Sequence, residues 1–330
     1  MFAVIMKASF DIRYGDVPEP VLQPGGAIVR VDASGICGSD MHRYSGEEPI
    51  KDTNKVCGHE LGGHIVEVAD DVVGFRVGQK VAVNPAVACG ECSYCRGDLS
   101  YLCENQKWIP AMTERVLVPA KNLVSLPEDF DALYAPLVEP AATSLHTCAG
   151  INDMNVVLIG LGTVGLLAMQ VLERQGNRVA LADVSEFAME QARSMGARHV
   201  VDLRNEDCEG RIAGILGDRK VDVVIDGVGI PSTVNRGIRI VKKRGTVRIV
   251  GASRVSIDFD CRTALLKEVV LESVYIYTED DFRTAARMMV NGEIAYRDLV
   301  SRVFPLSEAR EAFEFKQNQP ATKVLLRHIS

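Results

Sequence analysis

The sequence predicts an α/β protein in which a β-rich domain is joined to a doubly wound dinucleotide-binding domain. Three observations lead to this prediction. Short β-branched segments fill the first 120 residues, strands and helices alternate from Asn155 onward, and a glycine-rich turn opens the alternating region. A chain of 330 residues is also long enough to build two hydrophobic cores.

The β-rich region shows glycine or proline near most of its segment ends. Strands are expected at 27–36, 63–72, 79–85 and 114–120. The alternating region predicts strands at 156–160, 178–183, 221–229, 245–251 and 269–275, with helices at 164–176 and 186–196. A mixed tail follows a helix at 283–292. We expect this tail to return to the first domain, which gives a domain of residues 1–143 and 285–330 and a second domain of residues 144–284.

The composition is that of an ordinary soluble globular protein, with 47% apolar and 25% charged residues. The formal net charge of −7 argues against a nucleic acid or an anionic membrane as partner. The basic run 242–244 is expected at a helix C-terminus, where cations offset the helix dipole.

No signal peptide is apparent, and glycines break the most apolar runs, so neither secretion nor a membrane span is expected. A cytoplasmic location is therefore predicted, where thiols stay reduced. The nine cysteines are therefore interpreted first as metal ligands or core residues, in preference to disulfides.

Four of these cysteines are closely spaced, in the order Cys89, Cys92, Cys95 and Cys103. Two Cys-x2-Cys steps deliver three thiolates from a tight loop, and the longer gap lets the chain return with the fourth. Four thiolates complete a tetrahedral zinc shell and leave no position for substrate, so the predicted site is structural. Four unrelated core cysteines, or a redox Cys-x2-Cys pair, explain the spacing less well.

A second metal site is indicated by Cys37 in GICGSDMH and by His59 and Glu60 in CGHELGG. A catalytic zinc uses three protein ligands and keeps one position open. Either Glu60 or Glu139 would supply the carboxylate. Glu139 has an alternative interpretation as an acid at a helix N-terminus, just before Pro140.

The glycine-rich turn reads Gly160-Leu161-Gly162-Thr163-Val164-Gly165 and lies between a predicted strand and a predicted helix. Its glycines permit a tight turn and close approach of a pyrophosphate to the helix N-terminus. Asp183 ends the next strand, where it can bind a ribose diol and repel a 2′-phosphate. The sequence therefore favours NAD over NADP.

Together these motifs resemble the zinc-dependent medium-chain dehydrogenase/reductase family, in its polyol, sugar-acid and threonine dehydrogenase branch. The resemblance covers nearly the whole chain. It also includes VPEP, VPAKNLVSLP, LVEPAATSLH and FPLSEAREAFE.

This resemblance implies a GroES-like catalytic domain, a Rossmann domain and an active site in the cleft between them. It implies two zinc ions per subunit, with Cys37, His59, Glu60 and Glu139 at the catalytic one. Ser39 and His42 match a proton relay, and Asp40 matches an acid near the zinc. Cofactor contacts are expected at Gly160, Gly162, Thr163, Val164, Gly165, Asp183, Val228, Val250 and Gly251. A homodimer or homotetramer is expected, with 269–275 as a candidate edge strand.

The function predicted from these residues is oxidation of a secondary alcohol of a polyol, sugar acid or cyclitol by NAD⁺. Threonine or butanediol oxidation is the alternative within the same chemistry. A non-catalytic NAD-binding relative and a zinc-free reductase are alternatives of other classes.

Two departures from the family weaken the substrate inference. The segment between Cys103 and Thr113 is short, and Ile276 stands where polyol enzymes often have arginine. Trp108 in that segment either lines the substrate opening or packs in the core.

Overall fold

The computed structural model describes residues 1–330 except 51, 218–219 and 329–330. It divides into two compact units, the first formed by residues 1–142 and 277–330 and the second by residues 143–276. The predicted second boundary, after residue 284, therefore lies too late. Tyr277 and Phe282 are both buried, with their rings 5.7 Å apart, and helix α9 (Glu279–Val290) belongs with them to the first unit.

The first unit is built around a seven-stranded sheet. Its strand order is β16-β17-β3-β4-β5-β9, and β8 pairs with β3. The bounds are β3 Gly26–Ile36, β4 Glu60–Val68, β5 Lys80–Val83, β8 Arg115–Pro119, β9 Leu123–Ser125, β16 Val300–Pro305 and β17 Lys323–Arg327. The long strand β3 contacts β4, β8 and β17, so it holds most of this sheet together.

Smaller elements surround this sheet. Strand β1 (Phe2–Ala8) pairs with β2 (Asp11–Asp16), and β6 (Ala86–Val87) pairs with β7 (Lys107–Trp108). The helices are α1 Gly38–Tyr44, α2 Ser93–Arg96, α9, α10 Ala309–Asn318 and the first half of α3 Val138–Thr147. Short 3-10 turns lie at Ser100–Leu102, Ala120–Asn122, Ala132–Leu137, Arg297–Leu299 and Leu306–Glu308.

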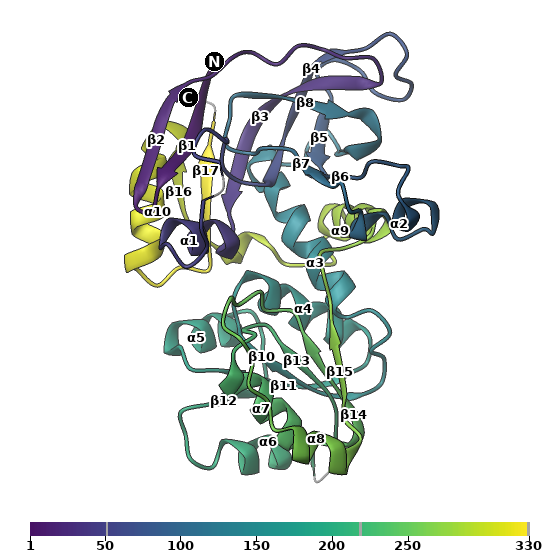
Figure 1. Cartoon of the computed structure of the whole chain (residues 1–330), viewed down its shortest axis with the longest axis vertical. Helices are drawn as coiled ribbons and strands as arrows, with labels where there is room; N and C mark the ends of the chain where they lie inside the picture. The colour runs from purple at the N-terminus through teal and green to yellow at the C-terminus, as the bar shows by residue number, and fades with distance from the viewer. Residues whose placement is uncertain (51, 218–219, 329–330) are drawn as a thin grey trace. The chain divides into compact units, whose positions relative to one another are not determined.

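The two ends of the chain meet in the first unit. Strand β17 runs antiparallel to β3, with Leu325 opposite Gly35. Both ends of the chain lie in this unit (Figure 1), and one core cluster combines Val4 and Met6 of β1 with Val324 and Leu326 of β17. The C-terminal strand thus completes a sheet that the N-terminal half begins.

The second unit is a six-stranded parallel sheet in the order β12-β11-β10-β13-β14-β15. Its strands are β10 Asn155–Ile159, β11 Arg178–Asp183, β12 Val200–Asp202, β13 Val221–Asp226, β14 Val241–Ile249 and β15 Val270–Ser273. Its helices are α4 Thr163–Arg174, α5 Glu186–Ser194, α6 Cys208–Leu216, α7 Pro231–Ile240 and α8 Cys261–Lys267.

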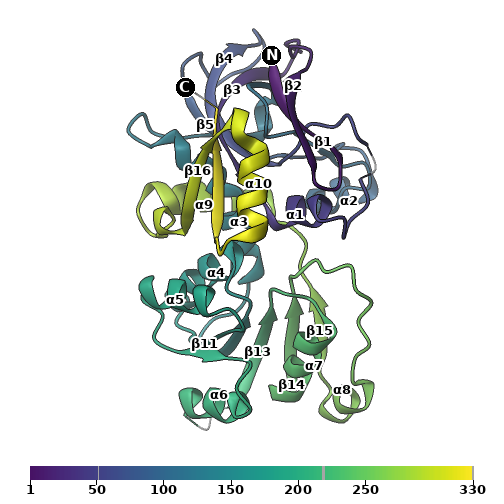
Figure 2. The same cartoon turned by 90° about the vertical axis from the view of Figure 1, so that its left-hand side faces the viewer.

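The strand order reverses at β10, which is the mark of a doubly wound sheet. Right-handed crossovers then place helices on both faces. In Figure 2, α4 and α5 lie near β11, and α7 and α8 lie near β14. The predicted fold class is confirmed.

The basic run 242–244 does not cap a helix. These residues lie in strand β14, where Lys242 pairs with Asp222. The carbonyls at the end of α7 are instead bound by Lys267, whose Nζ lies 2.8 Å from Ile238 O and 2.7 Å from Arg239 O. Among the described residues, no helix is long and apolar enough to cross a membrane.

Candidate metal centres and cofactor site

The four clustered cysteines converge, and their sulfur atoms all lie within 4.8 Å of one another. Cys92 Sγ lies 3.5 Å from Cys95 Sγ and 3.9 Å from Cys103 Sγ, and Cys89 Sγ lies 3.9 Å from Cys95 Sγ. A tetrahedral zinc with Zn–S bonds of about 2.3 Å separates its sulfurs by about 3.8 Å. The spacing of these sulfurs therefore fits a closed zinc site.

The local backbone favours thiolates in this lobe. Hydrogen bonds from the backbone N–H groups of Glu91 and Cys92 lower the pKa of Cys89 to about 6. The pKa of Cys95 is raised to about 12, first by burial and also by its sulfur neighbours. Four adjacent thiols cannot all ionise alone, whereas a divalent cation stabilises all four as thiolates.

A second cluster lies where β3 and β4 meet. Cys37 directly follows β3, His59 directly precedes β4 and Glu60 is the first residue of β4, so the antiparallel pairing of these strands brings the three residues together. One ligand atom of each lies within 4.8 Å of the others. Sulfur, imidazole nitrogen and carboxylate oxygen form a donor set that suits zinc and is too small to close its shell.

The Glu60 carboxylate also takes part in a buried ion pair. Its two oxygens accept hydrogen bonds of 2.7 and 2.8 Å from Lys323 Nζ on β17. Glu60 is 0% and Lys323 2% exposed. The carboxylate lies over Gly35, where any Cβ would overlap Glu60 Oε2. A glycine in β3 is thus needed for Glu60 to reach across the sheet.

Glu139, in the first turn of α3, is a second buried carboxylate near this cluster. Burial and the charge of Glu60 raise its pKa to about 7, against the opposing effect of His59. Its carboxylate lies outside the trio whose ligand atoms converge. The Tyr277 hydroxyl is near enough to Glu139 for its own pKa to be raised well above the usual value, chiefly by burial. The Tyr277 hydroxyl itself makes no hydrogen bond of good geometry to a described residue.

The pKa of His59 is raised well above its usual value. Burial alone would lower it, but the charge of the adjacent Cys37 and its hydrogen bond outweigh burial, and Asp40 and Glu139 act in the same direction. The cluster therefore carries an excess of negative groups, which a metal dication would neutralise.

The remaining predicted catalytic residues lie on α1. Asp40 is buried and accepts a hydrogen bond of 3.0 Å from the backbone N–H of Cys37, which fixes the start of this helix. Ser39 is half-buried in the first turn. His42 lies one turn later, and its Nδ1 is 2.6 Å from Glu47 Oε2 at the surface. Ser39 and His42 thus lie three residues apart on one helix face.

The glycine-rich turn has the backbone that its sequence predicts. Gly160 has φ 95°, and a Cβ on Gly165 would overlap Gly160 O, so both positions need glycine. Gly162 is the N-cap of α4, and Thr163 and Val164 form its first turn. No side chain fills the space beside Gly162 among the described residues. The N-terminus of α4 is therefore open to a phosphate.

Asp183 lies at the end of β11 beside this turn. Its carboxylate accepts hydrogen bonds of 2.7 Å from Leu161 N, 2.7 Å from Val184 N and 2.8 Å from Ser185 N. The predicted contacts Val228, Val250 and Gly251 follow β13 and β14 at the same carboxyl edge. The side chain of Val228 would lie 3.0 Å from a Cβ on Gly160. The structure therefore gathers all predicted cofactor residues at this edge.

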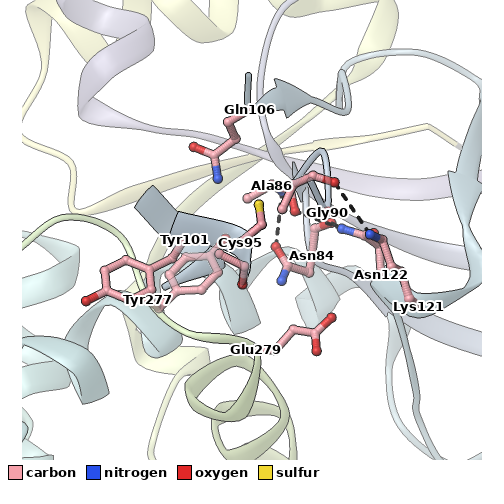
Figure 3. A pocket seen from close by; sticks show the side chains of 12 residues that line it. Asn84, Ala86, Gly90, Cys95, Tyr101, Gln106, Lys121, Asn122, Tyr277 and Glu279 are labelled. Atoms are coloured by element: carbon pink, nitrogen blue, oxygen red, sulfur yellow. Dashed lines mark hydrogen bonds between the residues drawn. The ribbon is translucent and has the colours of Figure 1, made fainter. Parts of the chain in front are cut away.

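A hollow of about 250 Å³ lies in the first unit beside the cysteine lobe. Figure 3 shows amide, hydroxyl and charged side chains around it, from Asn84 and Gln106 to Tyr277 and Glu279. Asn122, a buried member of this lining, donates to the carbonyls of Asn84 and Ala86, and its Oδ1 has no partner among the described residues.

Comparison with known proteins agrees with this geometry. Residues 23–128 match the alcohol dehydrogenase GroES-like domain, and residues 163–291 match the zinc-binding dehydrogenase domain. An L-threonine 3-dehydrogenase from Pyrococcus abyssi is 30% identical over 324 residues, which are 94% of this chain and 92% of that protein. This chain belongs to the zinc-dependent medium-chain dehydrogenase family. It is an oxidoreductase of the alcohol dehydrogenase type.

Two solved structures place this dehydrogenase among close structural relatives. A zinc-binding dehydrogenase from Sinorhizobium meliloti, bound to NADP, has a TM-score of 0.87 at 30% identity, and 99% of each chain is covered. L-idonate 5-dehydrogenase from Escherichia coli has a TM-score of 0.86 at 25% identity, covering 99% of this chain and 98% of that one.

Sequence reasoning missed two contacts of this centre. Lys323 pairs with Glu60, which is 263 residues away, and no motif of the sequence predicts this contact. The contact between Trp108 and His59, with ring centroids 5.6 Å apart, was also not foreseen. The apolar strand around Lys323 offers one signal, because a lysine in a buried strand requires a buried acid.

Replacing Lys323 by methionine should destabilise the metal-free dehydrogenase by about 3–5 kcal/mol, because Glu60 would be left buried without its cation. The loss should be smaller after zinc loading, since the metal then supplies positive charge beside Glu60. Denaturant unfolding with and without a chelator measures both values.

Two control variants accompany this test. Lys323→Arg keeps the charge and should lose less stability, and Lys243→Met, at an exposed position, should change little. An equal loss with and without zinc would show that Lys323 acts only through packing.

Proposed function

We propose that this dehydrogenase oxidises a secondary alcohol of a polyol, sugar acid or cyclitol, with NAD⁺ as hydride acceptor. The observation that carries the proposal is the convergence of Cys37, His59 and Glu60 into an incomplete zinc shell. A zinc held there has a position left for an oxygen of the substrate. Such an ion supplies Lewis acidity that lowers the pKa of a hydroxyl.

The residues of the chain would then divide the remaining work. Ser39 would accept the proton of the substrate hydroxyl and give up its own hydroxyl proton, and His42 would exchange a proton with solvent at the end of this relay. The hydrogen bond between His42 Nδ1 and Glu47 leaves Nε2 as the atom that exchanges the proton. Asp40 would keep the start of α1, and with it Cys37, in place through its bond to the Cys37 N–H.

The alternatives are weaker for physical reasons. A non-catalytic relative would have no use for an open donor set beside Ser39 and His42. A zinc-free reductase would not need seven metal-binding side chains that converge in two clusters. Threonine oxidation remains the second candidate, because the Pyrococcus relative is an L-threonine 3-dehydrogenase. The structural similarity to L-idonate 5-dehydrogenase favours a sugar acid.

NAD is proposed over NADP because of the charges near Asp183. The cations on the neighbouring elements have acidic partners: Arg204 binds Asp202 at 2.7 Å, and Arg193 lies 3.1 Å from Glu186. Hydrogen bonds from Arg204 hold the pKa of Asp202 at about 2. These arginines are therefore engaged, and a 2′-phosphate would meet the Asp183 carboxylate. We further propose that the enzyme works in the cytoplasm, where its metal-binding thiols stay reduced.

The function is tested by NADH formation from NAD⁺ across polyols, aldonic acids, cyclitols, threonine and butanediol. We expect turnover of one polyhydroxylated class, lost on treatment with a chelator. Cys37→Ser should abolish turnover and leave NAD⁺ binding by calorimetry unchanged. Turnover of threonine alone would contradict the proposed substrate class, and full activity of the Cys37→Ser protein would remove its assigned role.

Asp183→Asn should raise the ratio of kcat/KM for NADP⁺ to that for NAD⁺ by about tenfold or more, because the repelling charge is lost while a side-chain oxygen remains. Steady-state kinetics with both cofactors measures this ratio. Wild-type protein that uses NADP⁺ as well as NAD⁺ would contradict the preference.

A homodimer or homotetramer formed through β15 is also proposed. This strand is the edge of the sheet and pairs only with β14 among the described strands. Its Val270 is 50% exposed, and Leu265 and Leu266 of α8 are 74% and 64% exposed. An exposed apolar edge suits antiparallel pairing with the same strand of a second copy about a twofold axis.

Sedimentation at micromolar concentration should give a dimer or tetramer. Val270→Lys should shift it to smaller species, because lysine on an edge strand opposes pairing. Val73→Lys, at a position 93% exposed in the first unit, is the matched control and should change nothing. A wild-type monomer would rule out this interface.

A further inference from the structure

A second hollow, of about 430 Å³, lies in the second unit where the start of β12 meets α6. It is shallow and open to solvent. Arg198 and His199, which directly precede β12, and Arg211 of α6 belong to its lining. Strands β10, β11 and β12 are parallel, so the start of β12 is at the amino edge of the sheet, whereas Asp183 ends β11 at the carboxyl edge. The residues of this β12–α6 hollow are therefore distinct from the cofactor residues.

The polar side chains of the β12–α6 hollow are two guanidinium groups and an imidazole. No carboxylate from the described part of the chain lines it. The whole chain has a formal net charge of −7, so this local charge is opposite in sign to that of the protein. Two guanidinium groups that face one space favour an anion with more than one negative charge.

Arg198 and Arg211 lack the acidic partners that most arginines of this unit have. Neither guanidinium makes a hydrogen bond or an ion pair with a residue that the structure describes. Burial raises the pKa of Glu173 and the charge of Arg198 opposes this rise, but the two side chains form no ion pair. The arginines of the second unit that lie within 3.5 Å of a carboxylate are Arg193, Arg204, Arg239, Arg244 and Arg248.

The helix dipoles do not account for these two arginines either. The end of α6 already has a cation, because Arg178 Nη1 would lie 3.6 Å from a Cβ on Gly217, the C-cap residue. Arg211 belongs to the first half of α6, where a cation opposes the dipole. The last turn of α5 already contains Arg193. Arg198 and Arg211 are thus free to bind a ligand.

Gly214 keeps the β12–α6 hollow open. A glycine inside a helix is less stable than an alanine, so it needs a reason. A Cβ on Gly210 would overlap the Asp207 side chain, whereas a Cβ on Gly214 would meet no atom within 4 Å. Gly214 also has no positive φ. Neither packing nor backbone conformation requires glycine here, and any side chain at this position would enter the space above α6.

The remaining walls of the hollow are hydrocarbon. Val201 is buried in the core of the second unit, Ile215 packs against that core, and Val200 is half-buried beside them. Since a water molecule occupies about 30 Å³ of the liquid, the hollow has room for more than a single phosphate group. Cations and aliphatic side chains together suit an anion that carries an apolar body.

We propose that the β12–α6 hollow binds a phosphate monoester with an aliphatic body. Its phosphate accepts hydrogen bonds from Arg198 and Arg211, and its aliphatic part lies on Val200 and Ile215 beside Gly214. A phosphate monoester carries close to two negative charges at neutral pH, and its oxygens match the donors of a guanidinium group. The site is independent of the proposed function, because none of its residues belongs to the metal centres or to the cofactor edge.

Binding is tested by calorimetric titration of the zinc-loaded enzyme with n-butyl phosphate, inorganic phosphate and butyrate. Saturating NAD⁺ is present throughout, so that the N-terminus of α4 is not available to the phosphates. We expect n-butyl phosphate to bind about tenfold more tightly than inorganic phosphate, because its chain covers apolar walls. Butyrate, a monoanion, should bind more weakly than both. Equal affinities for the three probes would overturn the proposed ligand class.

Variants assign the binding to this hollow. Arg198→Met and Arg211→Met should each weaken n-butyl phosphate about tenfold, because each removes a charged donor. Gly214→Leu should abolish binding, since its side chain fills the space. Leucine favours a helix more than glycine does, so stability against denaturant should not fall and unfolding cannot explain the loss. Arg239→Met removes an arginine that lies 3.4 Å from Glu209, and as the matched control it should bind normally.

Unchanged binding in Arg198→Met, Arg211→Met and Gly214→Leu would show that the phosphate binds elsewhere and would overturn the proposal. A wild-type enzyme that binds neither phosphate at millimolar concentration would overturn it as well. These titrations measure binding without turnover. Their result therefore stands whether the enzyme proves to oxidise a polyol, threonine or another alcohol.

Discussion

The buried ion pair between Glu60 and Lys323 is the constraint on which the first unit depends. Its two residues belong to β4 and β17, the two strands that flank β3, and the carboxylate reaches across at Gly35. The pair therefore ties the last strand of the chain to the strands that carry the metal ligands. Ionic groups without water are costly unless they are well paired, so this region is stable only when its charges balance.

The balance is incomplete without a metal. Cys37, Glu60 and Glu139 can each carry a negative charge, and Lys323 is the cation bonded directly to this group among the described residues. The raised pKa of Glu139 is one sign of this excess, and the raised pKa of His59 is another. A centre that is unfavourable when empty becomes favourable when a dication binds, so that metal binding and folding reinforce each other. The four-cysteine lobe is stabilised in the same way when a dication binds its thiolates, and its zinc shell is then complete.

The parts predictable from sequence are those whose signal is local. The cysteine spacing, the glycine-rich turn and the alternating strands and helices each occupy one short stretch, and the predicted fold class and family are confirmed. Contacts between distant segments were not predictable. The partner of Glu60 is 263 residues away, and His59, the neighbour of Trp108, lies just before β4 in another part of the chain. The basic run 242–244 lies in a strand and not at a helix C-terminus, because strand β14 follows helix α7 without a loop. Lys267 from α8 binds the last carbonyls of α7 instead.

The residue that replaces the expected arginine shows how backbone geometry can serve this centre. Ile276 has φ 43°, a conformation that a β-branched residue adopts only under strain, at a cost of roughly 1–3 kcal/mol. It is the last residue of the second unit, and Tyr277 begins the return to the first. An ordinary extended residue would point the following side chain elsewhere. The strained turn at Ile276 therefore accompanies the burial of Tyr277 near Glu139.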